Sequence, residues 1–226
     1  MPAPPRIKIC GLTRLEDAEH AVEAGAWAIG LIFFPRSSRA VALEPAQEIS
    51  RRLRRKAEIA GVFVNATIDE IVATSELVPL SLVQLHGDEG PMYATEVARR
   101  TGARVIKAAR VESKADVQAL DAFRTQDFHL LDTLVPGEAG GTGQTFDWSL
   151  ARHRVSSVPL ILSGGLTAEN VGEAIAQVGP WGVDVASGTE AAPGIKDPAK
   201  VEAFVAAVRA TAEEPSPEPA TQEAVR

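Results

Sequence analysis

The side chains that can transfer protons lie at the ends of apolar stretches of this sequence. Cys10 ends the stretch Arg6–Cys10, and Asp132 ends the stretch Phe128–Asp132. A thiolate can act as a base when its surroundings stabilise it near neutral pH, and a positioned carboxyl group can act as an acid. Taken alone, Cys10 is also typical of an inert small apolar residue, and Asp132 of a hydrogen-bonded structural group or helix cap. Together they predict a base and an acid in one site.

Two glycine turns predict the class of ligand. Ser163-Gly164-Gly165 and Ser187-Gly188 each follow an apolar stretch and precede a helical pattern. Such turns offer backbone N–H groups with no side chain in the way, and paired turns of this kind form a common phosphate site. The alternative is that the glycines only make tight turns. With an acid and a base nearby, a phosphate site indicates proton transfer on a sugar phosphate.

Three further polar residues follow the predicted strands, and each has two interpretations. Arg36 and Arg39 are either solvated surface arginines or a clamp for a carboxylate or a second phosphate, which suits a guanidinium group. His86 either lines the site or is a hydrogen-bonded structural histidine.

The remaining charged residues depend on which way each strand faces. Lys8 lies two residues before Cys10, so both side chains point to the same side of a strand. Asp184 faces inward or outward according to register, and a structural role is favoured. Lys107 could form a Schiff base or pair with Asp132, and the sequence does not separate these possibilities.

Regularly spaced strands must position these groups. Eight apolar runs of strand length begin about 25 residues apart, which leaves room for one helix between each pair. The runs are Arg6–Cys10, Trp27–Phe34, Ile59–Val64, Leu80–His86, Arg104–Ala108, Phe128–Asp132, Val158–Ser163 and Gly182–Ala186. Most are apolar throughout, as expected for a parallel sheet covered on both faces.

Helical patterns fill the gaps between these runs. They cover Arg14–Ala24, Glu44–Lys56, Ile68–Leu77, Pro91–Arg100, Lys114–Phe123, Ala168–Val178 and Pro198–Ala212, with a shorter candidate at Trp148–Arg152. Thr13 and Glu16 are spaced as a capping box, and Gly25 stands where a helix should end. Asp69 and Glu70 suit the first turn of the third helix, and Pro198 suits the start of the last.

Strand and helix repeated eight times predict an α/β fold, a single-domain (β/α)8 barrel. A doubly wound open sheet is the alternative, but eight evenly spaced units favour closure. In such a barrel the active site lies at the carboxyl ends of the strands, where the polar and glycine residues collect. We expect residues 1–212 to form the barrel domain and residues 213–226 to be a disordered, acidic, proline-rich tail.

Composition excludes several classes of protein. Lys and Arg total 23 against 30 Asp and Glu, and the net charge of −7 argues against a nucleic-acid partner. No run reaches the roughly 18 apolar residues that a membrane helix needs, and the first residues lack the apolar core of a secretory signal. The one cysteine and the four histidines have no metal-ligand spacing. We therefore expect a cytoplasmic protein with no membrane partner.

Several motifs stand in order along the chain. They are Lys8-Ile9-Cys10-Gly11, Gly61-Val62-Phe63-Val64-Asn65, Val83-Gln84-Leu85-His86-Gly87, Leu131-Asp132-Thr133, Gly141 to Trp148, Leu162-Ser163-Gly164-Gly165-Leu166, and Val185 to Glu190 followed by Pro193, Gly194, Lys196 and Asp197. In this order they resemble the phosphoribosylanthranilate isomerases of tryptophan biosynthesis. The resemblance covers about Ile7 to Val208, and the set is far more specific than any one motif.

The resemblance implies an Amadori rearrangement. N-(5-phosphoribosyl)anthranilate would open and become 1-(2-carboxyphenylamino)-1-deoxyribulose 5-phosphate. Asp132 would be the general acid that protonates the ring oxygen so that a Schiff base forms, and Cys10 the general base that removes the proton from C2. No cofactor and no metal are implied, and the partner is a small-molecule substrate, with the protein a monomer or homodimer.

The resemblance also implies substrate contacts. Arg39, in the motif Ser37-Ser38-Arg39, matches the family's carboxylate-binding arginine better than Arg36 does. The glycine-rich loop before Phe146 would be a lid near the phosphate, and the segment Pro136–Ala139 is an insertion there. The expected substrate-binding residues are Arg39, His86, Gly143, Gly164, Gly165, Ser187 and Gly188.

Two alternatives to this reaction have sequence requirements of their own. Another phosphate-binding barrel enzyme, an indole-glycerol-phosphate synthase, would need a catalytic lysine and glutamate at strand ends and a longer N-terminus; a pentose-phosphate epimerase would need metal-ligating histidines. The second alternative is a non-catalytic barrel that only binds a sugar phosphate, which unchanged activity in a Cys10→Ala variant would favour.

Overall fold

The computed structural model describes residues 3–133 and 147–212. Among these residues, eight parallel strands close into a barrel in the order β1 to β8, with β8 paired back to β1. The strands are β1 Arg6–Cys10, β2 Ala28–Ile32, β3 Glu58–Phe63, β4 Leu82–Leu85, β5 Arg104–Val111, β6 Phe128–Thr133, β7 Leu160–Leu162 and β8 Gly182–Val185. The predicted (β/α)8 barrel is confirmed. The predictions for Gly143, the loop 135–146 and the tail 213–226 concern residues outside the described part of the chain.

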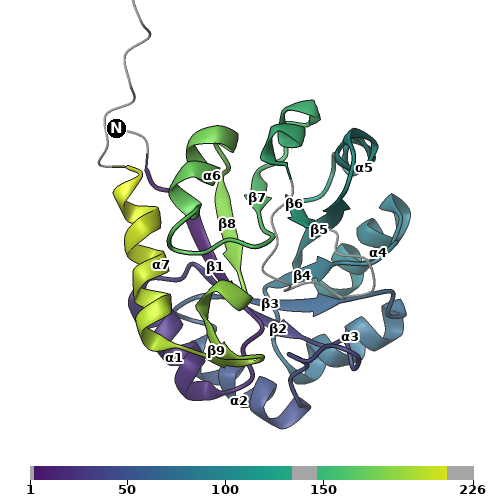
Figure 1. The fold of residues 1–226 in the computed structure, drawn as a ribbon. Coiled ribbons are helices and arrows are strands. Elements are labelled where there is room, and N and C mark those ends of the chain that lie inside the picture. The colour runs from purple at the N-terminus through teal and green to yellow at the C-terminus, as the bar shows by residue number, and fades with distance from the viewer. Residues whose placement is uncertain (1–2, 134–146, 213–226) are drawn as a thin grey trace, which may run out of the picture.

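Helices surround the barrel, as Figure 1 shows, and α7 lies beside both α1 and α6. The α-helices are α1 Leu15–Ala24, α2 Leu43–Leu53, α3 Ile68–Leu77, α4 Pro91–Thr101, α5 Lys114–Ala119, α6 Val171–Val178 and α7 Pro198–Ala210, and the 3₁₀ helices are η1 Leu120–Ala122, η2 Trp148–His153 and η3 Ser187–Thr189. None of the helices in the described part of the chain is long and apolar enough to cross a membrane.

A short hairpin follows β8 that the sequence pattern did not predict. Its strands are β9 Glu190–Ala192 and β10 Ile195–Lys196, paired antiparallel. Two- and three-residue strands are too short to show an alternating pattern, so they escape detection by periodicity. Gly194 in the turn has a φ of 78°, a conformation that favours glycine.

Most predicted helix ends are confirmed, and one is wrong. Gly25 ends α1 in the left-handed conformation, and Pro198 opens α7. Asp69 and Glu70 lie in the first turn of α3 as predicted, and Glu70 also forms a capping box with Thr67 that the sequence analysis above does not predict. Thr13, however, does not cap α1: the helix begins at Leu15, and the Thr13 hydroxyl donates instead to the carbonyl oxygen of Gly194, 2.6 Å away. The unpredicted hairpin supplies the acceptor that draws this hydroxyl away from the helix.

The apolar core has two parts. A large cluster lies between the strands and the helices, and a smaller one fills the barrel interior. The interior cluster consists of Ala28, Ala60, Leu82, Ile106, Ala108, Phe128, Leu130 and Ile161. At the amino ends of the strands the rings of Trp27, Phe128 and Trp181 pack together, with centroids 4.8 to 5.6 Å apart. Apolar side chains therefore fill this end of the barrel.

A buried ion pair crosses the join between β1 and β8. Lys8 and Asp184 are partners in the strand register, and Lys8 Nζ lies 2.8 Å from Asp184 Oδ1. Ser163 on the next strand donates to Asp184 Oδ2 at 3.2 Å. Burial has the largest effect and by itself would lower the pKa of Lys8, but the charge of Asp184, the hydrogen bond to it and the influence of Cys10 together outweigh burial and hold this pKa above its ordinary value. Lys8 therefore keeps its charge inside the barrel.

Removal of one partner of this pair should destabilise the protein strongly. Lys8→Met leaves the Asp184 carboxylate buried without its cation, and we expect a loss of about 3–5 kcal/mol in the free energy of unfolding. The double variant Lys8→Met/Asp184→Asn removes both charges and should recover most of that loss. Urea unfolding at neutral pH measures both. Equal losses in the two variants would show that the ion pair does not determine the stability.

Candidate active site

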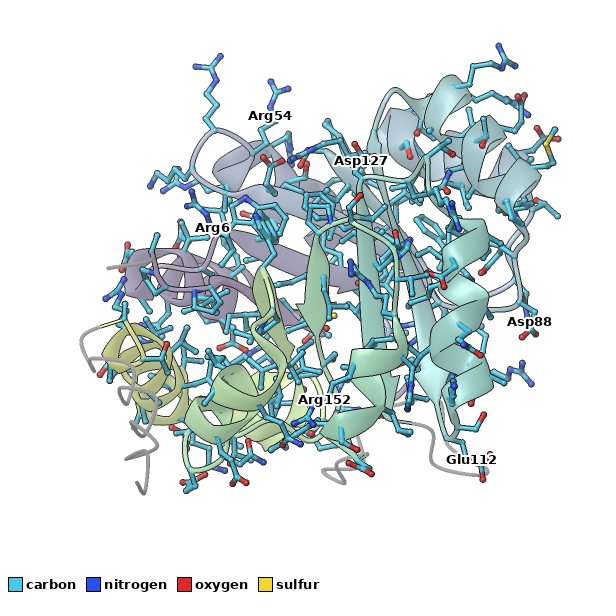
Figure 2. The ribbon with its side chains drawn as sticks, turned by 90° about the horizontal axis from the view of Figure 1, so that it is seen from above. Arg6, Arg54, Asp88, Glu112, Asp127 and Arg152 are labelled. Atoms are coloured by element: carbon cyan, nitrogen blue, oxygen red, sulfur yellow. The ribbon has the colours of Figure 1, made fainter. Side chains whose placement is uncertain are left out.

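A cavity lies at the carboxyl ends of the strands. Figure 2 shows the strand direction: Arg6, Arg54 and Asp127, which begin or precede strands, lie toward the top, whereas Asp88 and Glu112, which follow β4 and β5, lie lower. Of the predicted site residues, the cavity is lined by Cys10, Arg39, His86, Asp132, Gly164, Gly165 and Ser187. The barrel thus brings together side chains that are up to 177 residues apart in the chain (from Cys10 to Ser187).

Cys10 is the last residue of β1 and is buried, with 6% of its surface exposed. Its register partner on β2 is Gly30, where an added Cβ would lie only 2.6 Å from Cys10 Sγ. The absence of a side chain at Gly30 therefore leaves room for the sulfur. Burial raises the pKa of the Cys10 thiol, and the neighbouring charge of Lys8 opposes this rise.

Asp132 lies in β6 and is also buried. His86 approaches it from the end of β4, with His86 Nε2 3.2 Å from Asp132 Oδ2. The other ring nitrogen of His86, Nδ1, lies 3.0 Å from the amide nitrogen of Gln84. Gln84 also lines the cavity, although the sequence pattern did not identify it as a site residue. One signal could have done so: Gln84 stands two residues before His86, and residues at that spacing in a strand point to the same side.

Arg39 is held by an acidic partner from the hairpin after β8. Its Nε donates to Glu190 Oε1 at 2.8 Å and its Nη2 donates to Glu190 Oε2 at 2.7 Å. Lys196 Nζ lies 3.3 Å from Glu190 Oε1. Burial would raise the pKa of Glu190, but the Arg39 hydrogen bonds and the Lys196 charge outweigh it and lower this pKa. Two basic side chains, Arg39 and Lys196, therefore share one carboxylate beside the cavity.

Arg39, Glu190 and Lys196 form a cluster, here called the Glu190 cluster, that the sequence did not predict. Glu190 and Lys196 both stand in the motif that supports the family resemblance, but the hairpin that brings them under Arg39 was not predicted. Arg36, the other candidate arginine, is exposed and lies 5.0 Å from the Phe34 ring. It does not line the cavity.

The two glycine turns meet at the ends of β7 and β8. Gly164 and Gly165 have φ values of 91° and 62°, which favour glycine. Gly188 does not line the cavity itself, but an added Cβ there would lie 2.0 Å from the carbonyl oxygen of Leu166. The two turns are therefore packed backbone to backbone, an arrangement that directs peptide groups rather than side chains toward a ligand.

Two of the open alternatives, for Asp184 and Lys107, are resolved by the face of the strand on which each side chain lies. Asp184 faces inward, pairs with Lys8 and also lines the cavity. Lys107 does not pair with Asp132: its Nζ lies 2.8 Å from Glu89 Oε2 and donates to the carbonyl oxygen of Gly87 at 2.6 Å. It lines a separate pocket toward α5 instead of this cavity. It occupies the opposite face of β5, so a Schiff-base role in this site is wrong.

One wall of the cavity is apolar. Ile32, Phe34, Val62 and Val64 line it from β2, β3 and the segments that follow them. The opposite side carries the glycine turns, and Cys10 and Asp132 lie on strands between these regions. Such an arrangement suits a ligand with an aromatic ring at one end and a phosphate at the other, joined by a part that gains and loses protons.

The chain matches known proteins over almost its whole length. The family model described as N-(5'-phosphoribosyl)anthranilate (PRA) isomerase matches residues 7–207. The N-(5'-phosphoribosyl)anthranilate isomerase of Pseudomonas putida strain KT2440 is 49% identical over 205 residues, covering 90% of this chain and 97% of that protein.

Solved structures agree with this match. The phosphoribosyl anthranilate isomerase of Thermotoga maritima has a TM-score of 0.83 and 41% identity, covering 91% of this chain and 99% of that one. A structure of phosphoribosyl anthranilate isomerase in complex with reduced 1-(o-carboxyphenylamino)-1-deoxyribulose 5-phosphate has a TM-score of 0.79 and 39% identity, with the same coverage.

The raised pKa of Cys10 predicts how the thiol reacts. Alkylation needs the thiolate, so its rate in the folded protein should still climb about tenfold per pH unit where an ordinary thiol levels off, near pH 8.5. Because Cys10 is the one cysteine in the sequence, the mass gained with iodoacetamide reports this residue alone. The urea-unfolded chain is the control. A folded-state midpoint at or below that of the unfolded chain would contradict the effect of burial.

Proposed function

Since the chain belongs to the N-(5'-phosphoribosyl)anthranilate isomerase family, and is an enzyme of tryptophan biosynthesis, we propose that Cys10 is the general base and Asp132 the general acid of its reaction. The observation that carries this proposal is their common cavity: both side chains line it at the carboxyl ends of β1 and β6. A thiol and a carboxyl group are the two proton-transfer groups that an Amadori rearrangement needs.

The reaction can be written with these two groups alone. The Asp132 carboxyl group gives its proton to the ring oxygen; the bond from C1 to that oxygen breaks with its electron pair on oxygen, and the nitrogen lone pair forms the C1=N bond. The Cys10 thiolate then takes the proton from C2, and that electron pair forms the C1=C2 bond as the nitrogen recovers its own. Loss of the C2 hydroxyl proton and gain of a proton at C1 give the ketone.

The surroundings of Cys10 suit this step. Burial raises the pKa of the thiol, so the thiolate, once formed, is a strong base. The charge of Lys8 opposes the rise. The cationic C1=N group formed in the first step would add a second positive charge near the sulfur. It also acidifies the proton on C2, so acid and base steps support one another.

The cavity also supports an orientation for the substrate. We propose that Arg39 binds the anthranilate carboxylate, since Glu190 fixes its guanidinium group at the cavity and a guanidinium group suits a carboxylate. The turns with Gly164, Gly165, Ser187 and Gly188 would bind the phosphate through backbone N–H groups. The apolar wall formed by Ile32, Phe34, Val62 and Val64 would hold the aromatic ring.

The other expectations concern the whole protein. The substrate is a small molecule. We propose residues 1–212 as one barrel domain that acts in the cytoplasm, as a monomer or homodimer.

Removal of the acid or the base should abolish turnover without unfolding the protein. Cys10→Ala and Asp132→Asn should each lower kcat by about 10²–10⁴-fold, the usual contribution of a positioned acid or base. The measurement is the loss of anthranilate-type fluorescence when purified protein meets phosphoribosylanthranilate, with circular dichroism as the check on folding. A folded Cys10→Ala variant with wild-type turnover would show that the base is elsewhere.

The role of Arg39 is tested by affinity. In a Glu190→Gln background, which leaves no uncompensated carboxylate, Arg39→Ala should raise KM about tenfold or more because a charge-assisted hydrogen bond to the substrate is lost. Glu190→Gln alone is the matched control. Binding of inorganic phosphate should change little, since the proposed phosphate turns are untouched. An unchanged KM would refute the carboxylate assignment, and weakened phosphate binding would move Arg39 to the phosphate.

A further inference from the structure

We propose that His86 acts through Asp132: it donates a hydrogen bond to Asp132 Oδ2 and so stabilises the carboxylate that forms when Asp132 gives its proton to the substrate. His86 is then a positioning residue, whereas the sequence predicts a substrate contact for it. The inference rests on the proposed role of Asp132 as the acid. It is carried by the chain of side chains Gln84, His86 and Asp132, which all line the cavity.

Gln84 determines which way the hydrogen bonds run from Gln84 through His86 to Asp132. It is 1% exposed and lies in β4, and its side-chain amide nitrogen is 3.0 Å from His86 Nδ1. An amide N–H is a donor, so Nδ1 must be the acceptor. A neutral imidazole carries one hydrogen, which then stands on Nε2. Nε2 is the ring nitrogen that lies 3.2 Å from Asp132 Oδ2.

His86 Nε2 needs a partner, and Asp132 Oδ2 is the acceptor that lies beside it. This nitrogen is buried, and within the described part of the chain it makes no aligned hydrogen bond. A buried polar atom of this kind is rare in folded proteins. Hydrogen bonds between catalytic groups are often poorly aligned before substrate binds and tighten in the complex. A small rotation of the ring would complete the bond.

The backbone on both sides of His86 is fixed. Its N–H donates to the carbonyl oxygen of Phe63 at 2.9 Å. The next residue, Gly87, donates to Glu89 Oε2 at 2.9 Å and accepts from Lys107 at 2.6 Å. The buried Lys107–Glu89 pair, which takes no part in the proton transfers, therefore anchors the loop that carries His86.

Donation to Asp132 would favour proton transfer and leave substrate binding unchanged. When the proton leaves Asp132 for the ring oxygen, the carboxyl group becomes a carboxylate. A hydrogen bond to a carboxylate is roughly twice as strong as one to a neutral group, so the bond from Nε2 strengthens as the proton departs. An interaction that is stronger in the transition state than in the ground state raises kcat.

The test compares two substitutions at one position. His86→Leu removes the donor and should lower kcat by about 100-fold, the lower end of what a positioned acid contributes, with KM within about threefold of wild type. His86→Gln keeps an N–H near the position of Nε2 and should recover kcat to within about tenfold of wild type. A raised KM with unchanged kcat in His86→Leu would overturn the proposal in favour of a substrate contact. Equal loss in both variants would also overturn it.

A measurement without turnover tests the same chain. The ¹⁵N shifts of the His86 ring in the intact wild-type protein should show the hydrogen on Nε2, and Gln84→Met should weaken this preference. A hydrogen on Nδ1 would reverse the chain and overturn the proposal. Full activity in Asp132→Asn would instead refute the proposed acid, and the ring shifts would still report the hydrogen-bond direction, so the two failures are distinguishable.

Discussion

Closure of the barrel between its first and last strands is the constraint on which the site depends. The join of β1 to β8 contains the buried Lys8–Asp184 ion pair, and Cys10 lies on the same strand two residues beyond Lys8. A charged pair inside a barrel has few arrangements in which both partners are satisfied. The pair therefore holds the register that points Cys10 into the cavity, and its cation opposes the rise in the pKa of the thiol.

The two ends of the barrel interior hold different kinds of side chain. Toward the amino ends of the strands the interior is filled by apolar side chains and the three packed rings. Toward the carboxyl ends the inward positions are taken by Gln84, Asp132 and Asp184. Every second residue of a strand points into the barrel. A strand can therefore place an apolar side chain in the packed interior and, two residues later, a polar side chain in the cavity.

Two buried carboxylates, Glu190 and Glu89, hold loops in place without being the proposed acid or base. Glu190 holds Arg39 and Lys196 together, and Glu89 holds Lys107 and the loop that begins at Gly87. In both cases a buried carboxylate accepts several hydrogen bonds, so its charge is compensated. Such anchors let loops at the carboxyl ends of the strands present side chains with the precision of the strands themselves.

The sequence by itself determined the strands and the closed barrel, because apolar runs and turn glycines are local signals, and it offered Cys10 and Asp132 as candidates for the proton transfers. It did not determine which charged groups meet. Lys8 and Asp184 are 176 residues apart in the sequence, and Arg39 and Glu190 are 151 apart. Lys107 pairs with Glu89 and not with Asp132. A pairing of this kind depends on strand register and on which face a side chain occupies, and a shift of one residue reverses that face. Only the closed barrel decides it.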